Sequence, residues 1–248
     1  MMDIRPLTER EDLKSVVRLQ RQIWGFEDVD LIPLRLFVVA SKIGGQVYGA
    51  FDGAHLIGFC MAIPGVKPGG KTYLHSHMLG VLAEYRNTGV GRTLKLTQRD
   101  DALARGIDLI EWTFDPLEIK NAFFNMERLG AIVRRYVPNQ YGTTSSPLHG
   151  GLPTDRCIAE WWIAGPRVRT VLAGKRFEGN PGGNPIEERI SIPADIAILR
   201  SNQPACARDI QQKASERFRS AFDRGLAVIG FEKSEQAGTY LLGKWEST

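Results

Sequence analysis

Two hydrophobic periods divide the first 165 residues into short segments. Apolar positions two apart, or short continuous apolar runs, predict strands, whereas apolar positions three and four apart predict helices. The predicted strands cover residues 3–7, 47–51, 56–63, 71–81, 107–114, 133–137 and 157–163. The predicted helices cover about residues 9–24, 33–43, 91–105 and 119–129. Strands that alternate with helices in this way predict an α/β fold built on a central sheet.

Local signals refine three of these elements. Thr8 opens an S/T-x-x-E capping box, which predicts the start of the first helix. The spacing of Leu36, Phe37 and Ala40 predicts that these three side chains face inward from the second helix. Asp52–Gly53 suits the positive φ angles of a tight turn, so the two strands around it are expected to form a hairpin.

The segment after residue 165 has its own pattern. It predicts strands at 189–192, 227–231 and 239–242 and a helix at 205–224. We therefore expect a first domain over residues 1–165 and a small α+β extension over 166–248, with Gly179–Pro185 as the best candidate for a linker. The pattern leaves open whether the extension has its own core or completes the sheet of the first domain.

Composition narrows the class of protein. The chain has 248 residues, 43% of them hydrophobic, and 32 Lys and Arg against 28 Asp and Glu give a net charge of +4. This mild excess suits anionic small ligands and gives no support for a nucleic-acid partner. The three cysteines are an odd number without paired spacing, so a reducing, cytoplasmic setting is expected. The first residues lack a leader pattern and no apolar run is long enough to span a membrane, so neither secretion nor a membrane partner is expected.

A glycine loop is the most informative motif. The predicted strand 71–81 leads into Arg86-x-x-Gly89-x-Gly91, and a predicted helix follows directly. Glycines allow backbone N–H groups to approach a phosphate closely, and the start of a helix adds partial positive charge. A P-loop is absent, and a dinucleotide fingerprint would need a third glycine where Leu94 stands. By itself, however, a Gly-x-Gly pair is more often a plain turn.

The loop and its surroundings resemble the GNAT N-acyltransferase superfamily, whose loop reads Q/R-x-x-G-x-G/A. The similarity extends to the order of elements over residues 3–163 and to the segment Glu127–Ala131, which follows the predicted fourth helix. The strings His75–Val81, Trp112–Leu117 and Asn121–Asn125 further suggest a less-studied branch of predicted acetyltransferases. The resemblance implies a mixed central sheet flanked by helices. It also implies acetyl-CoA, or another acyl-CoA, as the donor to a primary amine of a small-molecule acceptor in a ternary complex.

The same resemblance implies a set of residues that bind coenzyme A. A backbone stretch of the strand pairs with the pantetheine arm, the glycine loop holds the pyrophosphate, and two asparagines on one helix face reach the arm. These residues are Leu79, Gly80, Val81, Arg86, Asn87, Thr88, Gly89, Val90, Gly91, Arg92, Asn121 and Asn125. The alternative for the two asparagines is a solvated polar face. Lys95 and Arg99, further along the helix after the loop, are expected to be exposed to solvent.

Three residues are candidates for the proton transfers of amide formation. His75 stands eleven residues before Arg86, where the family often has a carboxylate that acts as the base, and an ordinary histidine pKa near 6.5 suits that role. His77 is two residues further on and is expected to share a face with His75, Leu79 and Val81. A structural, hydrogen-bonded histidine is the alternative for both.

Glu111, on the following strand, is the third candidate, and its alternative is an exposed strand carboxylate. Two histidines could also begin a zinc site, but no spacing nominates a third ligand, so no metal is expected.

The sequence departs from the family at the residue that protonates the leaving thiolate. Many relatives have a tyrosine where this chain has Met126. Tyr136 or Tyr141 could replace it, although packing roles are favoured for both, or the thiolate leaves without a dedicated acid.

Two further side chains are open to a functional and a structural interpretation. Cys60 is expected to be a buried small hydrophobe rather than a nucleophile. Arg156 either binds a substrate carboxylate or forms an internal ion pair near Asp155.

Three functions from different classes therefore remain at the level of sequence. The first is an acyl-CoA-dependent N-acyltransferase, the second is a non-catalytic acyl-CoA-binding sensor or interaction module, and the third is an α/β interaction protein whose glycine loop is only a turn. Exposed edge strands in such sheets also make a homodimer possible.

Overall fold

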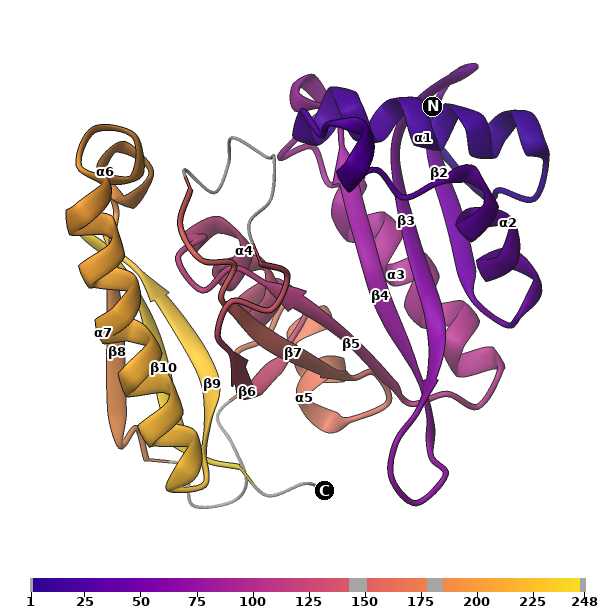
Figure 1. Cartoon of the computed structure of the whole chain (residues 1–248). Helices are drawn as coiled ribbons and strands as arrows, with labels where there is room; N and C mark the ends of the chain where they lie inside the picture. The colour runs from indigo at the N-terminus through magenta and orange to yellow at the C-terminus, as the bar shows by residue number, and fades with distance from the viewer. Residues whose placement is uncertain (1, 143–150, 178–184, 246–248) are drawn as a thin grey trace. The chain divides into compact units, whose positions relative to one another are not determined.

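The computed structural model describes residues 2–142, 151–177 and 185–245 (Figure 1). These residues pack into two compact units, one ending at Trp112 and the other beginning at Thr113. Each unit is described separately below. Among the described residues, no helix is both long and apolar enough to cross a bilayer.

The first unit is a mixed sheet with helices on both faces. Its strands follow the order β1-β2-β3-β4-β5, with antiparallel neighbours from β1 to β4 and a parallel pair at β4 and β5. This arrangement confirms the expected mixed sheet flanked by helices. The elements are β1 (Met2–Pro6), α1 (Arg10–Trp24), η1 (Asp28–Asp30), α2 (Leu34–Lys42), β2 (Gln46–Asp52), β3 (His55–Val66), β4 (Thr72–Val81), η2 (Ala83–Tyr85), α3 (Val90–Ala104) and β5 (Leu109–Phe114), which runs across the unit boundary.

The core of the first unit forms where α1 and α2 cover the sheet. Phe37 of α2 is fully buried and meets the ring of Phe59 of β3 edge to face at 6.1 Å. Burial of such a side chain contributes about 1.5–3 kcal/mol. Ala40 faces inward as expected, but Leu36 is 37% exposed, so the prediction for Leu36 is wrong. Position 36 precedes position 37 by 100° around the helix and therefore lies outside the buried stripe.

The local turn signals have different outcomes. Gly25 ends α1 with a left-handed φ of 64°, and Gly53 turns the β2–β3 hairpin with φ 59°, so both glycines act as their positions predict. The capping box is wrong, because α1 begins at Arg10 with Glu9 at the N-cap and no side-chain cap bond. Thr8 therefore lies outside the helix.

The second unit also combines a sheet with helices. Its strands follow the order β7-β6-β9-β10-β8, and the pairs β7–β6, β6–β9, β9–β10 and β10–β8 are antiparallel. The short helices α5 and α6 are additions that the sequence pattern did not predict. The elements are α4 (Ile119–Phe123), a π-helical turn η3 (Phe124–Arg128), β6 (Ile132–Val137), β7 (Arg156–Trp162), α5 (Pro166–Leu172), β8 (Glu188–Pro193), α6 (Ile196–Asn202), α7 (Pro204–Asp223), β9 (Leu226–Lys233) and β10 (Ala237–Lys244).

The extension completes the sheet of the second unit and does not form a separate core. Val228 of β9 pairs with Val133 of β6. The ring of Phe218 on α7 stacks on Tyr136 of β6 at 5.5 Å and meets Tyr240 of β10 at 5.0 Å. This packing answers the question that the sequence left open. The domain boundary at 165/166 stays a prediction, and most of the expected linker lies outside the described residues.

A buried ion pair also joins the extension to the segment after β5. Arg200 of α6 donates to Asp115 Oδ2 at 2.6 Å and to Glu118 Oε1 at 2.7 Å. Arg200 and Asp115 are both buried. An ion pair of this kind is costly to break from one side, because the remaining charge stays buried.

Candidate active site

The glycine loop leaves its backbone open at the start of a long helix. Gly89 has φ 95°, and a Cβ added there would meet nothing within 4 Å. Val90 begins α3, which has 15 residues. The first N–H groups of a helix have no partners within it and carry the positive end of the helix dipole. The loop therefore has the geometry and charge of an anion site, which the residues fit without rearrangement.

Two side chains of the loop donate hydrogen bonds to backbone carbonyl groups of the protein. Arg86 donates through Nε to Val81 O at 3.2 Å and through Nη2 to Ile23 O at 3.5 Å. Thr88 Oγ1 donates to Tyr85 O at 2.7 Å. These contacts engage the side chains of Arg86 and Thr88 with the protein, so an anion would meet mainly the backbone of the loop.

β4 and β5 form a fork. Their parallel pairing covers only Leu74 with Ile110 and His75 with Glu111. Further along β4, the segment Leu79–Val81 pairs on its other side with β3. Because the ladder to β5 stops after His75, the backbone of Leu79–Val81 faces the opening of the fork. An extended chain can add to such a free edge as an extra strand does.

A β-bulge in β4 changes which side chains share a face. Met61 of β3 lies opposite Met78, but Ala62 lies opposite Ser76, so His77 is the extra residue. Ser76 Oγ contacts α3, and beyond the bulge Val81 contacts α3 as well, because its Cγ2 lies 3.8 Å from a Cβ added at Gly91.

His75 and His77 lie on the other face, the face that α1 covers. A Cβ added at Gly80, which shares that face, would lie 2.6 Å from Trp24 of α1. The prediction that His75 and His77 share a face with Leu79 and Val81 is therefore wrong. The bulge inserts one residue between the two pairs and exchanges the faces of the strand.

The two histidine rings are neighbours with neutral character. Their centroids are 5.8 Å apart. Burial, and next the charge of His77, lower the pKa of His75 to about 4, although the Glu111 carboxylate acts in the opposite direction. Burial also lowers the pKa of His77. His75 therefore carries a neutral imidazole at neutral pH, able to accept a hydrogen bond, but it is a weaker base than an ordinary histidine.

Glu111 is a buried partner of a lysine. It is 4% exposed, so the alternative of an exposed strand carboxylate is wrong. Lys67, from the end of the β3–β4 hairpin, donates to both carboxylate oxygens at 2.7 Å and also lies 4.4 Å from the ring centroid of Tyr73. Because Glu111 pairs with His75 in the sheet register, the ion pair lies beside the histidine, where the Glu111 carboxylate raises the pKa of His75 and the Lys67 ammonium lowers it.

The prediction that Lys95 is exposed to solvent is wrong. Lys95 is 2% exposed, not solvated, and Nζ donates to Ser76 Oγ at 2.8 Å. Ser76 in turn donates to Gln98 Oε1 at 2.9 Å. Gly91, Lys95 and Gln98 occupy one helical stripe that faces the sheet, and recognising that stripe would have predicted the burial of the lysine. Arg99, beside that stripe, is partly exposed.

The two asparagines lie in the second unit and differ in environment. Asn121 is exposed on α4, whereas Asn125 is buried in the π-helical turn. The alternative of a solvated polar face therefore does not hold for Asn125, and whether the two side chains act together stays a prediction. A role of either residue toward coenzyme A stays a prediction. Met126 is fully buried beside Asn125.

The other candidates of the second unit have structural partners. Tyr136 donates to Asp155 Oδ2 at 2.6 Å, and burial raises its pKa far above the usual value. Tyr141 shares a 3.0 Å hydrogen bond with Thr113. Arg156 is buried and donates to the carbonyl of Asp155 at 3.0 Å. These contacts favour a packing role for Tyr136 and the internal alternative for Arg156, whereas Tyr141 is 44% exposed and its role stays a prediction.

The described residues show the environment of Cys60 and the arrangement of possible metal ligands. Cys60 is buried, and burial raises the pKa of its thiol to about 12, so it is a small hydrophobe as expected. In residues 2–142, 151–177 and 185–245, no group of three or more His, Cys, Asp or Glu residues is placed to hold a metal ion.

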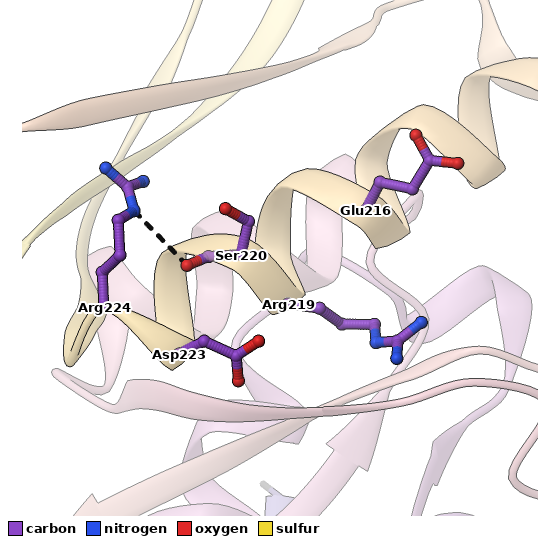
Figure 2. Close-up of a pocket in the computed structure, with 5 residues that line it drawn as sticks. All are labelled: Glu216, Arg219, Ser220, Asp223 and Arg224. Carbon is purple, nitrogen blue, oxygen red and sulfur yellow. Dashed lines mark hydrogen bonds between the residues drawn. The ribbon is translucent and has the colours of Figure 1, made fainter.

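A hollow on α7 has a different character. It is lined by Glu216, Arg219, Ser220, Asp223 and Arg224, all of them exposed. Figure 2 shows these side chains projecting from the end of the helix without converging, and the marked bond runs from Arg224 Nε to Ser220 O at 3.3 Å. This open, charged surface brings together no group suited to catalysis.

The sheet and helices described above share their fold with known N-acetyltransferases. Residues 13–130 match the model of the Acetyltransferase (GNAT) family. This matched segment, just under half of the chain, is similar to that family. No curated protein matches the chain.

Solved structures share the fold at low sequence identity. NAA60 of Arabidopsis thaliana, solved with acetyl-CoA, has a TM-score of 0.54 and 17% identity, and the match covers 66% of this chain and 100% of that one. The ribosomal-protein-S18-alanine N-acetyltransferase of Escherichia coli has a TM-score of 0.51 and 18% identity, with 66% and 94% covered. An aminoglycoside 6'-acetyltransferase of type Ii has a TM-score of 0.51 and 22% identity, with 65% and 97% covered. About a third of this chain lies outside each match.

Proposed function

We propose that this protein transfers the acetyl group of acetyl-CoA to the primary amine of a small molecule at the fork between β4 and β5. The observation that carries the proposal is the position of that fork directly before an open glycine loop at the start of α3. The fork offers a free strand edge, and the loop offers an anion site at the end of the same strand.

The donor fits the residues that are present. The pyrophosphate would meet the backbone of Asn87–Arg92, and the pantetheine arm would add to Leu79–Val81. When bound, acetyl-CoA supplies an activated thioester carbonyl. Solved structures of the same fold support this choice, because NAA60 of Arabidopsis thaliana and yncA of Salmonella typhimurium were both determined with acetyl-CoA.

The two faces of β4 support different sides for the two substrates. The loop, Leu79 and Val81 lie toward α3, and His75 and His77 lie toward α1. The donor therefore enters along α3, and the acceptor amine approaches from the side of the histidines. The neutral imidazole of His75 accepts a proton from the attacking amine, and the Glu111 carboxylate, held by Lys67, favours the imidazolium that forms. His77 lines the same approach.

The fold does not distinguish a small-molecule acceptor from a protein acceptor, because it serves both kinds. Among the similar structures, one acts on the alanine of ribosomal protein S18 and another acts on aminoglycosides. A panel of both classes tests the proposal. We expect thiol release from acetyl-CoA with at least one polyamine, amino acid or aminoglycoside. Turnover only with peptides would contradict the small-molecule acceptor, and absence of turnover with both classes would leave an acyl-CoA-binding module.

A further inference from the structure

Lys95 carries a buried cation toward the floor of the fork. Its Nζ lies 2.8 Å from Ser76 Oγ on β4 and 3.8 Å from the ring centroid of Trp112 on β5. A hydroxyl and a ring face are neutral partners, so among the described residues the ammonium group has no carboxylate in contact. The side chain therefore bridges the two strands where they begin to separate.

The position of Lys95 on α3 relates it to the donor. Gly91 lies against Leu79 and Val81, and Lys95, one helical turn later, lies against Ser76. Four residues advance an α-helix by about 6 Å. A donor whose phosphates lie at the start of α3 and whose arm follows Val81 and Leu79 therefore directs its sulfur toward Lys95. This step rests on the proposed function.

We propose that Lys95 is the acid that protonates the thiolate of coenzyme A as the amide forms. The acceptor nitrogen bonds to the thioester carbonyl carbon, the carbon–sulfur bond breaks, and its electron pair stays on sulfur. The Lys95 ammonium gives that sulfur a proton and becomes a neutral amine. The proton lost by the acceptor leaves through His75, and solvent returns one proton to Lys95. Amine and thioester thus become amide and thiol, with protons and charge in balance.

The electrostatic setting suits this transfer. Burial lowers the pKa of Lys95 to about 7, below the ordinary thiol value of about 8 to 9, so transfer to a thiolate is downhill. The titratable groups on the strands next to it include Cys60 of β3, His75 and His77 of β4 and Glu111 of β5. Cys60 and both histidines are neutral at pH 7, and Glu111 is held by Lys67 on the other face. None of these groups competes with Lys95 as a proton donor.

The test observes the lysine itself and needs no acceptor. The full chain is labelled at the lysine side-chain carbons, and Lys95 is titrated by NMR in complex with coenzyme A and with desulfo-coenzyme A, which lacks the thiol. The missing signal in Lys95→Met assigns the resonance, Lys95→Arg provides the same assignment if the methionine variant does not fold, and Lys213→Met, on exposed α7, is the matched control.

We expect the titration of Lys95 to differ by about half a unit or more between the two complexes, because the thiol of coenzyme A and the Lys95 ammonium titrate as a coupled pair when they lie within reach of each other. Coincident titrations in the two complexes would overturn the assignment of Lys95 while leaving the proposed function in place. Calorimetry that detects no binding of coenzyme A to the wild-type chain would overturn both.

Turnover gives a second readout once an acceptor is known. Loss of a general acid lowers kcat about 10²- to 10⁴-fold. We expect this loss in Lys95→Met and also in Lys95→Arg, because a guanidinium keeps its proton, while the Kd for coenzyme A stays within a few-fold of wild type. Full kcat in either variant would overturn the proposal.

Discussion

At the scale of single residues, burial determines the protonation states at the site. Lys95 of α3 packs against one face of β4, and His75 of β4 points to the other face. Burial lowers the pKa of both side chains, which favours their neutral forms. From the sequence we expected an exposed Lys95 and an ordinary pKa for His75. In the structure the sheet-facing stripe of α3 buries Lys95, and the pKa of His75 is lowered as well.

The burial of Lys95 is expected to make the free energy of unfolding depend on pH. Its pKa in the folded state, about 7, lies below the ordinary 10.5, so between these values the unfolded chain binds more protons and stability rises with pH. Below pH 7 both states are protonated and the full cost of burial is present. We expect Lys95→Met to stabilise the protein at pH 6 by several kcal/mol, at about 1.4 kcal/mol per pKa unit, and to flatten the dependence between pH 7 and 10. Urea unfolding across this range, with Lys213→Met as control, measures it; unchanged stability at pH 6 would contradict the burial of a charged lysine.

The lowered pKa of His75 is expected to set the pH dependence of kcat. Its neutral form is the one that accepts a proton, so the acid limb of kcat that belongs to His75 is expected near pH 4 rather than near 6.5. His75→Ala is expected to lower kcat by about 10²-fold or more with little change in the KM for acetyl-CoA. The exposed His55 supplies a matched control, His55→Ala. A histidine variant with full kcat would remove His75 from the mechanism.

At the scale of elements, local turn chemistry was predictable and tertiary adjustments were not. Gly25 and Gly53 act where their positions predict, because positive φ is a local demand. The π-helical turn after α4 is different: Glu127 accepts from Phe231 N at 2.8 Å, and Arg167 donates to Gly130 O at 3.0 Å, so distant elements hold the end of this helix. Such contacts leave no periodic signal in the sequence.

The ion pair between α6 and the segment after β5 makes the prediction at this scale. Arg200→Met removes one partner of a buried ion pair with Asp115, and we expect a loss of about 3–5 kcal/mol in the free energy of unfolding. Arg208→Met, at an exposed position of α7, should change it by less than about 0.5 kcal/mol. Denaturant unfolding compares the two variants. Equal stabilities would show that the ion pair contributes nothing.

At the scale of the whole molecule, the sequence resemblance ends near residue 165 but the packing does not. The order of the elements along the chain was predictable from periodicity, and the mixed sheet was predictable from the family resemblance that the glycine loop and its surroundings carry. The role of the extension was not, since pairing of β9 with β6 is a contact between residues almost a hundred positions apart.

We therefore expect a chain truncated after residue 165 to lose its fixed packing. Removal of α7 and β9 exposes Tyr136 and the edge of β6 in the second unit. Near-ultraviolet circular dichroism and binding of a hydrophobic dye measure the loss. A truncated chain that keeps sharp tertiary signals would show that residues 1–165 fold alone.

The central claim is that the loop before α3 binds the donor, and calorimetry tests it most directly. Acetyl-CoA and coenzyme A are titrated into the wild type, Gly89→Trp and Gly53→Trp. Both glycines have positive φ and open space around an added Cβ, so the two substitutions carry similar backbone strain, but only Gly89 lies in the loop. We expect the wild type and Gly53→Trp to bind acetyl-CoA and coenzyme A with micromolar affinity, and Gly89→Trp to bind neither ligand. A folded wild type that binds neither ligand, or equal binding by both variants, would contradict this claim.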